Sequence, residues 1–180
     1  GVVMKLHLGC GCRNFGADWI HIDGGDYDHL DYKDITNLEF SNNSVDLVYA
    51  SHVLEYFDRD EAPSLLQEWY RVLKPQGILR IAVPDFHALS FLYQQNKVKL
   101  KDILGPLYGK MKMGDHHIYH KTVYDRDTLG KALLDAGFKQ HELYSWKETE
   151  HANFDDHSQA HIPHMHKEHG CLVSLNMEGL

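Results

Sequence analysis

The sequence predicts an α/β fold in which helices cover a parallel sheet. Short runs at 5–8, 19–23, 45–51 and 78–83 have the length and composition of buried strands. Residues 61–74 instead repeat apolar side chains at every third or fourth position, as a helix packed on a sheet does. No linker or internal repeat interrupts this alternation, so residues 1–180 are expected to form one domain.

The first strand runs directly into a glycine turn, and an acidic residue ends the second strand. Gly9 and Gly11 flank Cys10 in this turn, and Asp23 ends the second strand. Glycines let the backbone approach a ligand closely, and a carboxylate in this position accepts ribose hydroxyls. Asn14 occupies the position of a third glycine and the acid comes early, so the spacing favours a nucleoside other than a dinucleotide.

Two helices have recognisable ends. The helix at 61–74 has Asp60 as its expected N-cap, and Lys74-Pro75-Gln76-Gly77 ends it in a turn. A second helix is expected at 126–136, with Asp125 as cap and Gly137 just beyond its end.

The connection between the first two strands is short. Only seven residues separate Gly11 from Trp19, too few for a helix of three turns. One face of the sheet is therefore left for another element or a second copy of the chain to cover, and a homodimer is one expectation. Further strands are predicted at 140–146 and 171–178.

Five segments, in this order, resemble a class I S-adenosylmethionine (SAM)-dependent methyltransferase. The resemblance extends to a small bacterial group of predicted methyltransferases related to the type 11 family. It implies a Rossmann-like three-layer sandwich with a mostly parallel seven-stranded sheet, an antiparallel C-terminal edge strand and a shortened first helix. The segments are Gly9-Cys-Gly, the strand ending at Asp23, Asp34-Ile-Thr-Asn-Leu-Glu-Phe, Asp46-Leu-Val-Tyr-Ala-Ser-His-Val-Leu-Glu-Tyr-Phe and Glu68-Trp-Tyr-Arg-Val-Leu-Lys-Pro-Gln-Gly.

The resemblance also implies a set of SAM-binding residues. The glycine turn would lie near the methionine part, the acid after the second strand near the ribose, and the next segment near the adenine. The residue after the third strand would line the floor below the sulfonium. The matching positions are His7, Gly9, Cys10, Gly11, Asp23, Gly24, Asp34, Ile35, Ser51 and His52. His7 stands where many members carry an acid that holds the ammonium group. The alternatives are that Asp23 and Asp34 are ordinary loop acids and that Ser51 caps a helix.

Histidines provide candidates for a general base. Methyl transfer from a sulfonium depends mainly on alignment, but a hydroxyl acceptor benefits from a base, and imidazole suits this role near neutral pH. The chain has 15 histidines. We expect His117 or His120 to be the base, with Tyr119 lining the acceptor pocket. The alternative is that each of these histidines only packs or faces solvent.

A metal site is the other hypothesis for the histidines, although our leading interpretation contains no metal. The residue types near the C-terminus suit zinc or another transition metal. They are Asp155, Asp156, His157, His161, His164 and His166. No strict zinc spacing is present. Cys10 and Cys12 form half of a metal motif, or they simply fill a tight turn.

Composition excludes several classes. The formal charge of −8 argues against a nucleic-acid partner, which would favour a basic patch. No apolar run is long enough to span a membrane and no signal peptide is visible, which predicts a cytoplasmic location. Three cysteines, two of them in one turn, argue against a disulfide framework.

The sequence therefore predicts an enzyme that transfers a methyl group from SAM to a small-molecule acceptor. The resemblance suggests a sugar or a surface-polysaccharide precursor as the acceptor. Two alternatives stay open. One is a non-catalytic accessory domain that binds SAM or a related nucleoside, and the other is a metal-binding protein that uses the late histidines.

Overall fold

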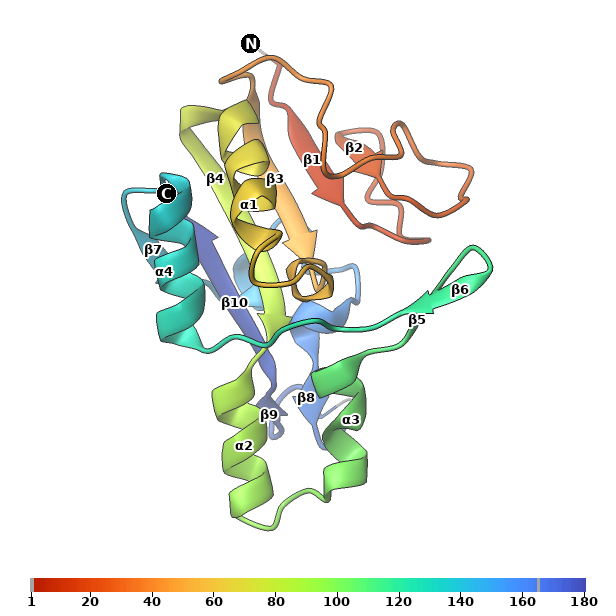
Figure 1. Ribbon diagram of the computed structural model, residues 1–180, viewed down its shortest axis with the longest axis vertical. Helices are drawn as coiled ribbons and strands as arrows, with labels where there is room; N and C mark the ends of the chain where they lie inside the picture. Colours follow the sequence, from red (N-terminus) through yellow and green to blue (C-terminus); the bar gives the residue numbers. More distant parts are fainter. Residues whose placement is uncertain (1, 165) are drawn as a thin grey trace.

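A six-stranded sheet forms the centre of the computed structural model, which describes residues 2–164 and 166–180 (Figure 1). The strand order is β2-β1-β3-β4-β10-β7. Only β10 runs antiparallel to its neighbours β4 and β7. An isolated parallel bridge between Ile22 and Tyr32 stands where a seventh strand would add to β2. The strands are β1 (Lys5–Leu8), β2 (Trp19–Ile22), β3 (Val45–Ser51), β4 (Leu73–Pro84), β7 (His141–Leu143) and β10 (Ser174–Gly179).

This arrangement confirms the predicted α/β class. The predicted antiparallel strand is β10, and it has β7 as its outer neighbour at the sheet edge. The predicted strand 171–178 is divided, because residues 171–172 leave the sheet and form the short β9 (Cys171–Leu172) with β8 (His161–Ile162). The predicted strand 140–146 is shortened to the three residues of β7.

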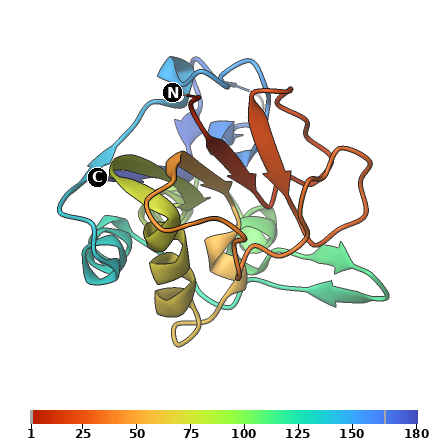
Figure 2. The same cartoon turned by 90° about the horizontal axis from the view of Figure 1, so that it is seen from above.

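Helices α1 (Ala62–Val72) and α4 (Arg126–Ala136) cover one face of the sheet (Figure 2). Their apolar stripes pack on alternate strand residues, among which Leu6, Leu79 and Ile81 are fully buried. Such burial contributes most of the favourable free energy of a fold of this size.

The predicted helix ends are partly right. Asp125 caps α4 by accepting the Thr128 N–H, as expected. At α1 the prediction of Asp60 was wrong: the Asp58 carboxylate accepts the N–H groups of Asp60 and Glu61. Asp58 precedes Asp60 by two residues, and its side chain reaches both donors in the turn before the helix.

The opposite face of the sheet has no helix after β1, as the short connection predicts. Residues 144–161, which include the 3₁₀ turns Trp146–Glu148 and His157–Gln159, cover it instead (Figure 2). The His151 ring stacks on Phe15 with centroids 5.4 Å apart. The Tyr49 hydroxyl of β3 donates to the Asp156 carboxylate, and burial raises the pKa of Tyr49, which keeps this donor protonated.

Arg80 of β4 is held among partners on the same face. Its Nε donates to Glu178 at 2.7 Å, and its Nη1 lies 3.3 Å from Glu150 and 3.1 Å from His151 Nε2. A buried charge needs such partners, because desolvation without them is costly. Burial, together with the Arg80 charge, lowers the pKa of His151 to about 4. His151 is therefore neutral at pH 7 and accepts from the guanidinium.

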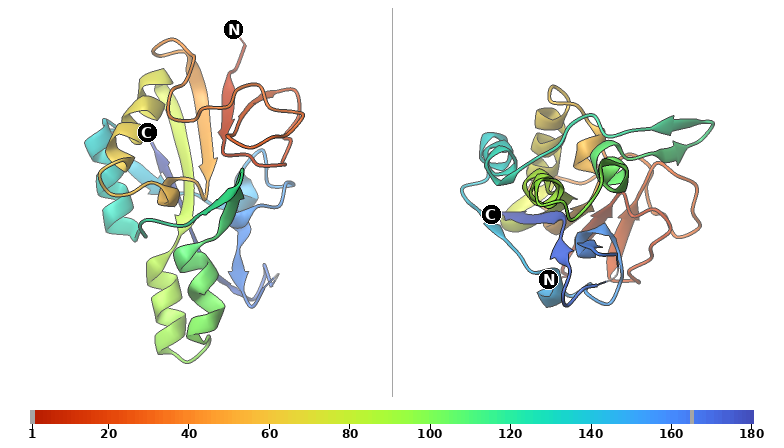
Figure 3. Two further views of the ribbon diagram at one scale, coloured as in Figure 1. Left: turned by 45° about the vertical axis from the view of Figure 1, so that its right-hand side comes forward. Right: turned by 90° about the horizontal axis from the view of Figure 1, so that it is seen from below.

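Two appendages extend beyond the carboxyl ends of the parallel strands (Figures 1 and 3). Helices α2 (Phe86–Gln94) and α3 (Leu100–Tyr108) lie side by side and enclose a small apolar cluster with Val173. A hairpin of β5 (Met111–Met113) and β6 (His116–Ile118) extends beneath the loops that follow β1 and β2. In the described part of the chain, no helix has the length and apolarity needed to cross a membrane.

The His151 environment predicts a loss of stability in mild acid. The pKa of this ring rises from about 4 when folded to 6.5 when unfolded, so the unfolded chain binds more protons between these values. We expect the free energy of unfolding to fall by about 2 kcal/mol from pH 8 to pH 5, measured by urea denaturation. Replacing His151 by Leu should flatten this dependence, whereas His164→Leu, at an exposed position, should not. An unchanged slope in His151→Leu would contradict the assignment.

Candidate functional site

The strand order places the candidate site at the carboxyl ends of β1 and β3. The chain leaves β1 toward β2 on one side and later enters β3 on the other, so the order reverses between these two strands. Ligands of open α/β sheets bind in the crevice at such a switch point. Here the carboxyl ends of β1, β2 and β3 are followed by the glycine turn, the loop after β2 and residues 51–57.

The glycine turn needs both of its glycines, for different reasons. Gly9 and Gly11 have φ values of 65° and 57°, in the left-handed region that side chains disfavour. A Cβ on Gly9 would overlap Val53, so this glycine permits close packing of the turn on the segment after β3. A Cβ on Gly11 would meet no atom within 4 Å, so Gly11 faces open space.

Asp23 is fixed at the end of β2 by two backbone donors. Its Oδ2 accepts the Gly11 N–H at 2.8 Å, and its Oδ1 accepts the Gly25 N–H at 2.7 Å. Each carboxylate oxygen has a second lone pair that these bonds leave unused. The side chain is half-buried. The structure thus brings Asp23 and the glycine turn together, and the carboxylate can still accept ligand hydroxyls.

Cys10 is a neutral thiol inside the turn. It is buried, and burial together with the nearby Asp23 raises its pKa to about 12. A thiolate is the form that binds metals and attacks electrophiles, and this environment opposes it. Cys12 is exposed. The turn-filling interpretation of Cys10 therefore fits the structure better than half of a metal motif.

The residues expected near adenine lie on the loop after β2. Asp34 is exposed, and its Oδ1 accepts both the N–H and the hydroxyl of Thr36 at 2.8 and 2.6 Å. These bonds lower the pKa of Asp34. The Ile35 carbonyl accepts from the Trp69 indole at 2.9 Å, which anchors the loop to α1. Gly24 is exposed next to Asp23, with the sulfur of Met113 near it.

His7 and Ser51 carry buried polar atoms without hydrogen-bond partners among the described residues: His7 Nδ1 and Ser51 Oγ. Ser51 ends β3 at the candidate site and does not cap the following turn. His7 points to the other face of the sheet, where its ring lies 4.1 Å from that of Phe15. Burial lowers the pKa of His7 well below its usual value. In this position it is a core residue that reaches no solvent, so its predicted contact with a cofactor gains no support.

A buried carboxylate next to His52 is the feature that sequence reasoning missed. Glu55 lies in the 3₁₀ turn Leu54–Tyr56 after β3, fully buried, and neither carboxylate oxygen has a hydrogen-bond partner in the described chain. Its Oε2 lies 3.3 Å from His52 Nδ1 and 3.8 Å from His120 Nε2. The sequence signal was an acid placed between the apolar Leu54 and the aromatic Tyr56.

The hydrogen positions on His52 follow from its other contacts. Asn176 Nδ2 donates to the Ser158 carbonyl at 2.9 Å, so Asn176 Oδ1 must accept the Ser174 hydroxyl at 2.8 Å. The Ser174 oxygen can then only accept from His52 Nε2, at 2.9 Å. A neutral His52 therefore carries its hydrogen on Nε2, and its Nδ1 presents a lone pair to Glu55.

His120 is placed in the same way. Its Nδ1 lies 3.0 Å from the Pro106 carbonyl, which only accepts, so a neutral His120 also presents a lone pair to Glu55. Gly109, with φ 61°, admits the ring, because a Cβ there would overlap it. When both rings are neutral, two imidazole lone pairs and a carboxylate thus converge without a donor. His52 itself has a left-handed φ of 56°, a strain that non-glycine residues retain mostly at functional sites.

The other candidate base and the late histidines are dispersed. His117 is exposed on β6, and no contact between it and Glu55 is present among the described residues. Among the late histidines, His151 packs under the sheet, His161 contacts the Gln159 carbonyl, and His164 is exposed. Within residues 2–164 and 166–180, no group of three or more His, Cys, Asp or Glu side chains is arranged to hold a metal ion.

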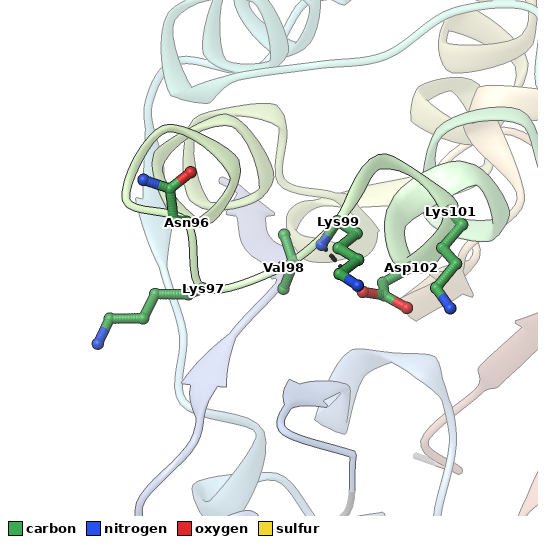
Figure 4. A pocket seen from close by; sticks show the side chains of 6 residues that line it. All are labelled: Asn96, Lys97, Val98, Lys99, Lys101 and Asp102. Atoms are coloured by element: carbon green, nitrogen blue, oxygen red, sulfur yellow. Dashed lines mark hydrogen bonds between the residues drawn. The ribbon is translucent and has the colours of Figure 1, made fainter.

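Two surface hollows lie away from this site. One, between α2 and α3, is bordered by side chains that point mostly to solvent (Figure 4). It is lined by Asn96, Lys97, Val98, Lys99, Lys101 and Asp102. The other lies between α1 and α4. Neither adjoins the glycine turn, and neither brings together groups that could carry out chemistry.

Comparisons with known proteins agree with this geometry. A family model described as a methyltransferase domain matches residues 25–81. A SAM-dependent methyltransferase from Archaeoglobus fulgidus is 17% identical, with a TM-score of 0.55 over 99% of this chain and 85% of that chain. The chain has the class I methyltransferase fold. No curated protein matches the sequence.

Two further methyltransferases share this fold. One, from Mesorhizobium loti, is 16% identical, with a TM-score of 0.55 over 99% of this chain and 90% of that chain. The other is the 1,6-didemethyltoxoflavin-N1-methyltransferase of Burkholderia thailandensis, solved with bound 1,6-didemethyltoxoflavin and S-adenosylhomocysteine. It is 12% identical, with a TM-score of 0.55 over 98% of this chain and 69% of that chain. The predicted resemblance to type 11 SAM-dependent methyltransferases is confirmed, and SAM is the cofactor that these matches support.

The residues present fit SAM. Gly11 borders open space, and Asp23 keeps free lone pairs. When bound, the cofactor supplies an activated methyl group on a sulfonium.

Glu55, His52 and His120 form what we call the Glu55 cluster. Because the buried Glu55 carboxylate has no hydrogen-bond donor in the described chain, we expect it to lower the stability of the fold. A buried carboxylate without a donor destabilises a fold by about 1–3 kcal/mol. We therefore expect Glu55→Gln and Glu55→Met to be at least as stable as the parent protein at pH 8, by urea denaturation. Glu39→Gln, at an exposed position whose side chain has no hydrogen bond or ion pair among the described residues, is the control and should change nothing. A loss of more than about 1 kcal/mol in both Glu55 variants would mean that Glu55 is stabilised by a charged partner.

Proposed function

We propose that this protein transfers the methyl group of SAM to a small-molecule acceptor. The observation that carries the proposal is the Asp23 carboxylate, held by the Gly11 and Gly25 N–H groups beside an open glycine turn. Two carboxylate lone pairs at this position suit the two hydroxyls of a ribose.

Each part of the cofactor would have its own binding residues. Gly9, Cys10 and Gly11 would approach the methionine part, with Asp23 at the ribose. The loop with Gly24, Asp34 and Ile35 would border the adenine, and Ser51 and His52 would lie below the sulfonium. Asp34 already bonds to Thr36, so its contribution would be the shape of the loop as much as a direct hydrogen bond.

The Glu55 cluster would take up the acceptor's proton. The Glu55 carboxylate lies 3.3 Å from His52 Nδ1 and 3.8 Å from His120 Nε2, so an imidazole that accepts a proton has an acceptor oxygen beside it. Of the two predicted bases, His120 is supported by its place beside Glu55, whereas His117 lies on the exposed hairpin. The carbonyl of Pro106 orients the ring, as a positioning group should.

The proposed acceptor is a small molecule. The Burkholderia neighbour was solved with bound 1,6-didemethyltoxoflavin, which agrees with a small acceptor. A sugar or surface-polysaccharide precursor rests on the family resemblance alone. The cytoplasmic location and the homodimer likewise stay predictions.

Binding of the cofactor is the first test. We expect S-adenosylhomocysteine to bind with micromolar affinity by calorimetry, and Asp23→Ala to weaken binding by about a hundred-fold, since two charge-assisted hydrogen bonds are lost. Asp26→Ala, an exposed acid on the same loop, is the control and should bind normally. NADH should not bind. No heat with either SAM or its demethylated product would refute the proposed function.

The proton acceptor can be tested once a screen with methyl-labelled SAM has found an acceptor. We expect His120→Gln to lower kcat by about a hundred-fold, as loss of a general base does, while the affinity for S-adenosylhomocysteine is unchanged. His117→Gln should retain normal activity. Equal effects of the two substitutions would remove the role assigned to His120.

A further inference from the structure

The short connection after β1 removes a device that α/β proteins use to bind anions. A helix that starts directly after a glycine turn presents free N–H groups and a partial positive charge to an anionic group. Residues 12–18 form only a turn and an extended segment, so no such helix end is present at Gly11. An anionic part of a ligand at this site needs a positive charge from elsewhere.

Arg13 lies at the position where that helix would begin. Its N–H donates to the Cys10 carbonyl at 3.1 Å, which closes the turn. Its Nε donates to the Asp155 carbonyl at 2.8 Å, which fixes the direction of the side chain. In the described chain its Nη1 and Nη2 make no hydrogen bond, and no carboxylate lies within 4 Å of them. A half-buried guanidinium with two free donors is unusual in a chain of net charge −8.

The positive charge of Arg13 acts on two histidines, His7 and His157. Burial and two other histidines lower the pKa of His7 in β1, and the Arg13 charge adds to this effect. Desolvation and His52 lower the pKa of His157, and the Arg13 charge again adds to it. His157 lies 5.5 Å from the His52 ring, just after β3. The contacts of Arg13 with the Cys10 carbonyl and the Asp155 carbonyl place it directly after the glycine turn at the end of β1.

We propose that Arg13 binds the carboxylate of the amino-acid end of SAM and replaces the missing helix end as its anion site. A planar guanidinium with two free Nη groups matches a carboxylate in a bidentate geometry. The glycine turn directly before it is the part of the site expected to border the methionine moiety. The inference rests on the proposed function, because it assigns one end of the same ligand.

Three nucleosides that differ only in their amino-acid end can distinguish the Arg13 contact from the other contacts of the site. S-adenosylhomocysteine has the whole amino-acid end, its decarboxylated analogue lacks only the carboxylate, and 5′-methylthioadenosine lacks the whole amino-acid end. Calorimetry would measure each of them on the parent protein and on Arg13→Met. Arg13→Lys retains the charge without the fork, and Arg126→Met, at an exposed position on α4, is the matched control. Thermal unfolding of each variant would show whether the loss of the Asp155 contact disturbs the fold.

The expected result is selective. Arg13→Met should lower the affinity for S-adenosylhomocysteine by roughly ten- to a hundred-fold, because a charge-assisted contact is lost. The remaining affinity should equal that of the parent protein for the decarboxylated analogue. The affinity of Arg13→Met for the decarboxylated analogue and for 5′-methylthioadenosine should stay that of the parent. The affinity of Arg13→Lys for S-adenosylhomocysteine should lie between those of Arg13→Met and the parent protein. The affinity of Arg126→Met should equal that of the parent protein. Added salt should weaken S-adenosylhomocysteine more than 5′-methylthioadenosine.

Other outcomes would overturn the inference in distinguishable ways. If Arg13→Met weakens all three nucleosides equally, Arg13 only supports the loop through Asp155. If the parent binds S-adenosylhomocysteine no better than its decarboxylated analogue, the carboxylate is not recognised. If the parent binds none of the three, the proposed function itself fails.

Discussion

The rest of this structure depends on how the face of the sheet beside β1 is kept from solvent. A connection of seven residues between Gly11 and Trp19 cannot form the covering helix, so residues 144–161 fold back across the strands. The hydrogen bond from Tyr49 to Asp156 and the contacts of Arg80 hold this segment in place. Polar groups on a sheet face are tolerated only when they are paired, and here the covering segment supplies the partners.

The same covering segment reaches the candidate site. Asp155 accepts from Arg13, and Ser158 orients Asn176, which in turn orders Ser174 and His52. A residue far along the chain thus controls which nitrogen of His52 carries a hydrogen. The substitute for a missing helix therefore also positions side chains at the carboxyl ends of β1 and β3.

The site combines rigid and unsatisfied parts. Asp23 and the glycine turn are fixed by backbone hydrogen bonds, as a binding site for a defined nucleoside requires. Ser51 and Glu55, by contrast, present buried oxygens without partners in the described chain. Such groups oppose stability, so their presence together beside a strained His52 indicates selection for function.

Local sequence patterns predicted some elements of the fold correctly and missed others. Apolar runs and the 3.6-residue period located β1, β2, β3 and the α1 and α4 helices, because local patterns dictate which faces are buried. Asp125 as a cap followed from the residue type, whereas Asp58 was missed because Asp60 stood closer to the helix. The glycine turn and Asp23 could be proposed together from the sequence. Both lie directly at the ends of predicted strands, and their short spacing along the chain indicates that they are neighbours.

By itself, then, the sequence determined the α/β class and the short first connection, and it predicted Asp23 as one end of a nucleoside site. Only the tertiary structure decided that His7 is a core residue, that His120 and not His117 lies beside Glu55, and that Arg13 contacts Asp155 beside the glycine turn. The physical reason is distance along the chain. Glu55 meets His120, and Arg13 meets Asp155, through contacts that span 65 and 142 positions, and no local periodicity encodes such pairs.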